Sequence, residues 1–103
     1  MRRKMTNPFT EKRIRHFERM SYEQLASLGC DDFLVSELEY LISETPLKDE
    51  DKRICVCFYI KKMTNEKTAE YLGFSVDKAN DRRKILHEKM ILTLIKMFFA
   101  YDD

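Results

Sequence analysis

Polar side chains that can pair with nucleic-acid bases are concentrated in one short stretch, VDKANDRRK, at positions 76–84. An asparagine such as Asn80 can form two hydrogen bonds with adenine, and a carboxylate such as Asp77 can accept one from the amine of cytosine. Lysine and arginine side chains nearby can meet phosphates. The candidate DNA contacts, including basic residues upstream, are Thr64, Ser75, Val76, Asp77, Lys78, Asn80, Asp81, Arg82, Lys84, Lys61, Lys62, Arg2, Arg3 and Lys4.

A helical wheel of the same stretch separates an inner half from an outer one, at about 100° per residue. The inner half is predicted to hold Val76, Ala79, Arg83, Leu86 and Met90. Asp77 and Asp81 point outward with Lys84, where a polyanion would lie. These two acids leave open the alternative that the stretch serves only the fold.

Other chemistry is poorly represented in the sequence. Cys55 and Cys57 form a C-x-C pair, but in a helix their sulfur atoms point to nearly opposite sides, and no second pair completes four ligands. We therefore expect buried thiols rather than a metal site. His16 and His87 stand alone, with no nucleophile, paired carboxylates or glycine-rich phosphate loop beside them. The sequence predicts a protein that is not an enzyme and binds no cofactor.

The elements that must position the polar stretch are two helices joined by a tight turn. Thr64 is a good N-cap for the first helix, and Gly73 stands where that helix must end in a left-handed residue. Ser75 can cap the second helix, and Asp77 lies in its first turn, where the helix dipole favours an acid. Ala69, a small residue inside the first helix, completes a pattern typical of a helix-turn-helix.

The segment T-N-E-K-T-A-E-Y-L-G-F-S-V-D-K-A at 64–79 resembles the helix-turn-helix of region four of bacterial sigma factors and of LuxR-type response regulators. The segment A-N-D-R-R-K-I-L-H-E-K-M at 79–90 resembles the LuxR-type recognition helix, and Leu47 with 51–59 resembles the preceding helix. The likeness covers roughly residues 47–90 and implies a small phage or bacterial transcription regulator that binds double-stranded DNA, with RNA polymerase as a further partner. Val76 and Asp81 stand where primary-type sigma factors carry Arg and Gln, so we do not expect recognition of the usual promoter hexamer.

The composition predicts an all-α fold of about six helices. Only two Gly and two Pro occur among 103 residues, of which 44% are apolar and 36% charged. We see no signal peptide or membrane span, and three Cys give no disulfide framework, so we expect a cytoplasmic protein. The net charge of +1 conceals an acidic middle, residues 20–51, between two basic ends, which are the parts that could contact DNA.

We expect one compact domain with three parts: a flexible basic arm at 1–8, an N-terminal helical hairpin region at 9–46 and the sigma-region-four-like helix-turn-helix region at 47–103. Thr10 is predicted to cap a first helix that runs to Met20, and Ser21-Tyr-Glu-Gln24 is a capping box for a second, which Gly29 ends. Asp31 or Asp32 is predicted to cap a third helix, which Thr45-Pro46 stops. A fourth begins near Lys48, and the last continues to about Phe99.

The C-terminal helix is apolar on more than one side. One stripe can pack inside the chain, and the other needs cover from the N-terminal region or from a second copy. A homodimer through this helix would use Leu86, Met90, Ile91, Leu94, Ile95 and Phe98. The sequence leaves two other functions open: a module that mimics sigma region four and docks on RNA polymerase or a sigma factor without touching DNA, and a helical scaffold with no nucleic-acid partner.

Overall fold

The computed structural model describes residues 6–99, and every regular element among them is helical, as predicted. Arg2, Arg3 and Lys4, three of the predicted DNA contacts, lie outside the described residues. The elements are α1 (Glu11–Glu18), α2 (Tyr22–Ala26), the 3₁₀ turn η1 (Cys30–Asp32), α3 (Val35–Glu44), α4 (Asp49–Cys55), the π-helical turn η2 (Val56–Ile60), α5 (Asn65–Leu72) and α6 (Val76–Phe98).

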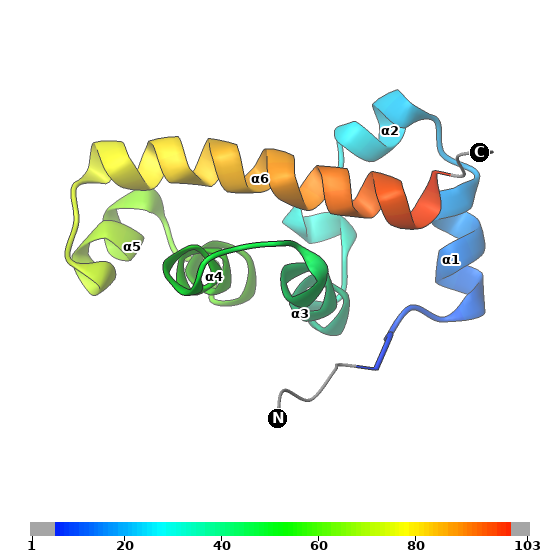
Figure 1. Cartoon of the computed structure of the whole chain (residues 1–103), viewed down its shortest axis with the longest axis horizontal. Helices are drawn as coiled ribbons and strands as arrows, with labels where there is room; N and C mark the ends of the chain where they lie inside the picture. Colours follow the sequence, from blue (N-terminus) through cyan, green and yellow to red (C-terminus); the bar gives the residue numbers. More distant parts are fainter. Residues whose placement is uncertain (1–5, 100–103) are drawn as a thin grey trace.

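Helix α6 is the axis around which the others pack (Figure 1). Helices α3, α4 and α5 lie along one side of it, α2 lies on the opposite side, and α1 packs at its C-terminal end. One hydrophobic core runs through the molecule. At the α1 end of α6, the rings of Phe9 and Phe17 each lie 5.1 Å from that of Phe98 between centroids. The N-terminal region therefore packs mainly on the second half of α6, which leaves the α5 end to the helix-turn-helix.

Capping side chains set the first two helix starts as the sequence predicted. Thr10 Oγ1 accepts a hydrogen bond from Arg13 N at 3.3 Å. Ser21 Oγ accepts from Gln24 N at 3.2 Å, and Gln24 Oε1 accepts from Ser21 N at 2.8 Å. Both capping residues satisfy amides that have no partner inside the helix.

The predicted cap of the third helix is wrong. Asp31 and Asp32 lie in η1, and α3 begins at Val35 with Leu34 in the N-cap position. Asp32 Oδ2 instead accepts from Gly29 N at 2.8 Å. Gly29 is extended with φ −121°, and it does not end the second helix as predicted, because α2 already ends at Ala26. The free amide of Leu34 is satisfied by Glu37 Oε1 at 2.9 Å. Because of the extra turn η1, Phe33 lies before α3 instead of inside it, and its ring stacks on that of Phe17.

The fourth helix starts near Lys48 as predicted but ends in the π-helical turn η2. Three consecutive residues of η2, Cys57, Phe58 and Tyr59, are buried. Consecutive residues of a regular α-helix are about 100° apart, so the wider turn lets the three side chains share the core more easily. Lys62 follows with φ 52°, and the chain then enters α5.

Candidate nucleic-acid interface

The turn between α5 and α6 has the geometry that the sequence predicted. Thr64 Oγ1 accepts from Lys67 N at 3.1 Å, and Ser75 Oγ accepts from Lys78 N at 3.1 Å. Gly73 is left-handed, with φ 78° and ψ 37°, and its amide donates to Ala69 O at 2.8 Å. Because only glycine adopts this backbone without strain, Gly73 ends α5 and frees Ser75 to begin α6 in a new direction.

Small residues hold the two helices of the motif close together. Thr68 and Ala69 of α5 and Ala79 of α6 are all buried. Asn65 adds polar contacts across the pair: its Nδ2 donates to Asn80 Oδ1 at 3.3 Å, and its Oδ1 accepts from Arg83 Nη1 at 3.2 Å. The start of α5 is thereby tied to the first turns of α6, which restricts how far the two can rotate relative to each other.

The first turns of α6 present a polar edge to solvent. Asp77, Lys78, Asn80, Asp81 and Lys84 are exposed and are called the polar edge below. Ser75 is also exposed, but its hydroxyl is engaged as the helix cap. The wheel prediction is wrong for two residues: Val76 is 43% exposed and Arg83 is exposed too, because α5 covers only the side of α6 that carries Ala79.

Two of the predicted basic contacts are engaged by acids of α4. Arg82 Nη2 lies 2.7 Å from Asp51 Oδ1, and this pair is mostly shielded, with 28% and 8% of the side chains exposed. Lys78 Nζ lies 3.1 Å from Glu50 Oε1, in a pair about half exposed. Arg82 therefore joins α6 to α4, and it can meet a phosphate only through its remaining donors or by leaving Asp51, so its DNA contact stays a prediction. Lys78 can reach one only by exchanging its partner.

The other basic candidates differ in how free they are. Lys84 has no ion-pair partner among residues 6–99. Lys61 Nζ lies 4.9 Å from the centroid of the Tyr71 ring, and Lys62 pairs with Asp31 at 3.5 Å on the surface. Lys84 is the polar-edge cation best placed to meet an anion. Sequence reasoning missed Asn65, Glu50 and Asp51 as members of this site, since they come from other helices and no local pattern marks them.

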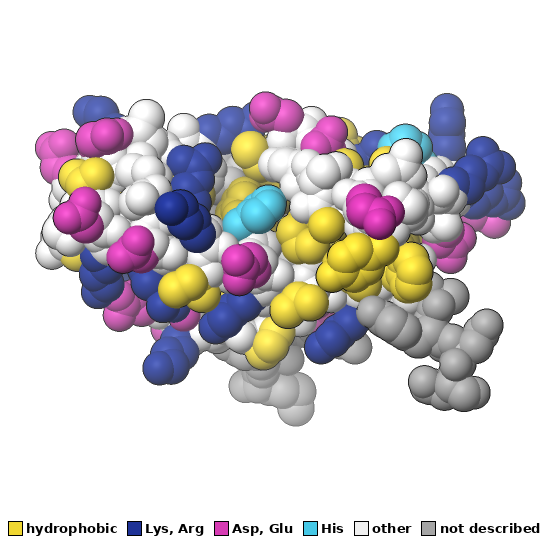
Figure 2. Space-filling model, turned by 90° about the horizontal axis from the view of Figure 1, so that it is seen from above, with side chains coloured by type: hydrophobic (Ala, Val, Ile, Leu, Met, Phe, Trp, Pro, Cys, Tyr) yellow, Lys and Arg dark blue, Asp and Glu magenta, His cyan; other side chains and the backbone are white. Residues whose placement is uncertain are grey.

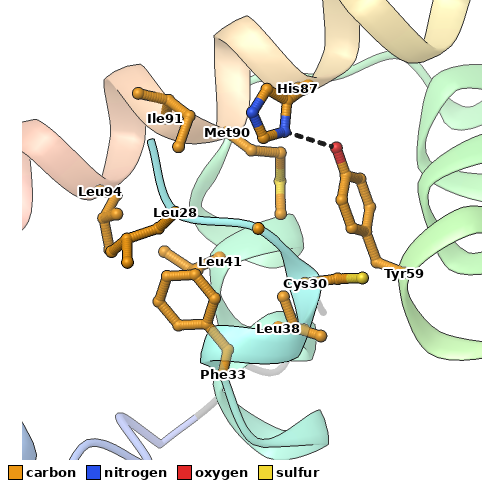
Figure 3. Close-up of a pocket in the computed structure, with 11 residues that line it drawn as sticks. Leu28, Cys30, Phe33, Leu38, Leu41, Tyr59, His87, Met90, Ile91 and Leu94 are labelled. Atoms are coloured by element: carbon orange, nitrogen blue, oxygen red, sulfur yellow. Dashed lines mark hydrogen bonds between the residues drawn. The ribbon is translucent and has the colours of Figure 1, made fainter. Parts of the chain in front are cut away.

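The residues predicted for a dimer through α6 are mostly inside the chain. Five of them are 7% exposed or less: Leu86, Met90, Leu94, Ile95 and Phe98. The sixth, Ile91, is partly buried and lines a small apolar hollow under the turn at Leu28 and Gly29 (Figure 3). These side chains form the core of the monomer, as the intramolecular alternative predicted, and are not free for a second copy.

The cysteines and His87 are placed in or beside this interior. Cys55 and Cys57 are buried, and burial together with the charge of Asp51 raises the pKa of Cys55 to about 12. His87 Nδ1 lies 3.2 Å from Tyr59 Oη at the rim of the hollow (Figure 3), and burial raises the pKa of Tyr59. No group of three or more metal-ligating side chains occurs within residues 6–99.

Over the same residues, no helix combines the length and apolar character needed to cross a membrane. Comparison with family models, with curated proteins and with solved structures found no match to the chain.

Proposed function

We propose that the chain is a sequence-specific regulator of transcription, phage or bacterial, that inserts the polar edge of α6 into the major groove of double-stranded DNA. The observation that supports the proposal is the turn at Gly73, which directs an exposed, hydrogen-bonding edge out of the molecule while Asn65 and Ala69 hold its back. A helix-turn-helix uses the N-terminal part of its second helix in this way.

Within this proposal the polar edge divides its work between bases and phosphates. Asn80 offers the amide that pairs with adenine, and Asp77 can accept from cytosine. Lys84 meets a phosphate. Thr64 begins α5 close to the DNA backbone, where amides of the first turn of α5 that have no partner inside the helix can donate to a phosphate. Lys78 exchanges Glu50 for a phosphate, because a half-exposed ion pair contributes at most about 1 kcal/mol. The acids also weaken binding to arbitrary duplexes, which favours specificity over bulk affinity.

A binding assay with matched lysine variants tests the proposal. Bound duplexes are first selected from random DNA, and affinity is then measured by fluorescence anisotropy over a range of salt. Lys84→Ala is expected to weaken binding and to reduce the slope of log K against log salt by about 1. Lys12→Ala removes the same charge from an exposed site on α1 and should change neither. Failure of the unmodified chain to bind any duplex at low salt would refute the proposal.

A second candidate is a module that docks on RNA polymerase or on a sigma factor without contacting DNA. The observation in its favour is the acid content of the site: Asp77 and Asp81 are exposed, and Glu50 and Asp51 neutralise two of the nearby cations. A pull-down with purified polymerase, run beside the DNA assay, separates the two. Capture of polymerase without any duplex binding would select this second function.

A further inference from the structure

The side of α6 opposite its buried residues carries an exposed stripe of mixed character. Ile85 and Leu92 are 40% and 53% exposed and stand two helical turns apart. Charged residues, all exposed, lie beside them at helical spacing, and Figure 2 shows hydrophobic and charged side chains intermingled on the face seen from above. The members, called the outer stripe below, are Asp81, Ile85, Glu88, Lys89, Leu92 and Lys96.

The order of charges along the outer stripe is symmetric about its midpoint, which falls between Glu88 and Lys89. The acids Asp81 and Glu88 occupy the half toward the N-terminus of α6, and the bases Lys89 and Lys96 the other half. Each acid has a base at the same distance on the other side of the midpoint. Ile85 and Leu92 are matched in the same way, apolar against apolar.

We infer that the outer stripe binds a second copy of this chain, with the two α6 helices side by side and antiparallel. In that arrangement Asp81 faces Lys96 of the second copy, and Ile85 faces its Leu92. The two-fold axis repeats both contacts once. Glu88 and Lys89 lie about 100° apart, on opposite edges of the stripe, and do not face each other across it. A parallel pair would instead place Asp81 opposite Asp81 and Lys96 opposite Lys96. The Asp81–Lys96 pairs therefore favour the antiparallel partner.

Apart from Asp81, which belongs to both sets, the dimer uses a different side of α6 from the predicted DNA contacts. Asn80 and Lys84 lie roughly 100° around the helix from the centre of the outer stripe, at about 100° per residue. Both remain accessible in the dimer, whereas Asp81 is neutralised by a lysine. The inference stands on the outer stripe alone and does not depend on DNA binding. Only four aliphatic side chains are covered, so we expect a weak dimer with a dissociation constant on the order of micromolar.

Analytical ultracentrifugation of the whole chain, without DNA, tests the inference from micromolar to submillimolar concentration. We expect a monomer–dimer equilibrium that weakens as salt is raised, since the paired charges are exposed. Asp81→Lys and Lys96→Asp should each raise the dissociation constant at least about tenfold, because each change makes two attractive pairs repulsive. An equimolar mixture of the two variants should restore association, because only the mixed dimer pairs opposite charges at both ends of the stripe.

Two neutral variants separate the stripe from general surface stickiness. Leu92→Ser should weaken the dimer, and Tyr71→Ser, at a residue of α5 that is 62% exposed, should not. Circular dichroism and thermal unfolding confirm that each variant is folded before it is compared. A chain that stays monomeric at submillimolar concentration and low salt would overturn the inference. So would a dimer that survives both charge reversals, or a mixture of them that does not associate.

Discussion

The carboxylate of Glu37 is buried in the core, where it pairs with Arg13 and accepts a hydrogen bond from a backbone amide. Its side chain is 1% exposed, and Arg13 donates to both oxygens, from Nε to Oε2 at 2.9 Å and from Nη2 to Oε1 at 2.8 Å. Arg13 Nη2 also donates to Asp32 O at 2.9 Å, and Leu34 N donates to Glu37 Oε1. One ion pair thus joins α1, η1 and the start of α3, and Arg13→Ala removes all of the arginine contacts at once.

The expected cost of Arg13→Ala lies between two limits. Breaking a fully buried ion pair costs about 3–5 kcal/mol, and an exposed pair contributes about 0–1 kcal/mol. Arg13 is 29% exposed, so water can partly reach the carboxylate once the arginine is gone. We expect a loss of about 2–3 kcal/mol at pH 7, which corresponds to a fall in Tm of roughly 10–20 °C for a domain of this size.

The loss should depend on pH in a direction that the structure determines. Burial raises the pKa of Glu37, but the hydrogen bonds from Arg13 and Leu34 and the charge of Arg13 outweigh it, and the net pKa is lowered. The pair therefore stabilises the fold above the ordinary carboxyl pKa and loses this effect as pH falls through the lowered one. In Arg13→Ala burial is largely unopposed, so the pKa of Glu37 rises and the variant gains stability relative to the unmodified chain as pH falls.

Urea unfolding followed by far-ultraviolet circular dichroism, repeated from pH 7 to pH 4, measures this difference. The destabilisation by Arg13→Ala should shrink steadily toward pH 4. Arg15→Ala is the control, because Arg15 pairs with Glu11 on the same helix with 66% and 83% of the two side chains exposed, and should cost less than about 0.5 kcal/mol. A loss for Arg13→Ala that is equally small, or that does not vary with pH, would refute the reasoning.

The two glycines and the three cysteines give further tests. An added Cβ would meet nothing within 4 Å at either glycine, so the effect of a Gly→Ala substitution on stability depends on the backbone conformation alone. Gly73→Ala, at φ 78°, should destabilise by about 1–2 kcal/mol in urea unfolding, whereas Gly29→Ala, at φ −121°, should be neutral or stabilise by up to about 1 kcal/mol. Equal effects would contradict the assigned turn. In the folded protein at pH 8, a thiol reagent should label Cys30 well before Cys55 and Cys57, since both are buried and the pKa of Cys55 is about 12. Rapid labelling of all three would mean that the core is open.

Local chemistry explains why much of the fold could be predicted from the sequence. The caps at Thr10, Ser21, Thr64 and Ser75 each bond to an amide three residues ahead. Such contacts form within one turn of chain, so residue type and spacing are enough to identify them. The same holds for Gly73, whose left-handed backbone follows from its own lack of a Cβ.

The start of the third helix depends on contacts between distant residues, which no local pattern reveals. Asp32 is as good a capping residue as Ser75, and it does accept from a backbone amide, but it closes η1 rather than opening α3. The choice depends on Phe33 reaching the ring of Phe17, sixteen residues earlier, and on Glu37 meeting Arg13. Tertiary packing also sets the π-helical turn η2, because burial of Phe58 and Tyr59 in the core overrides the regular helix.

For the candidate site, the sequence by itself determined the turn, the start of α6 and the exposure of Asn80 and Lys84. The turn and the helix start follow from Gly73 and the Ser75 cap, and the exposure follows from helical periodicity. The tertiary structure decided which cations are free, because Glu50 and Asp51 approach Lys78 and Arg82 from 28 and 31 residues away. It also decided which apolar stripe of α6 faces solvent. Periodicity groups the residues of a helix into faces, but only the packing of the other helices determines which face is covered.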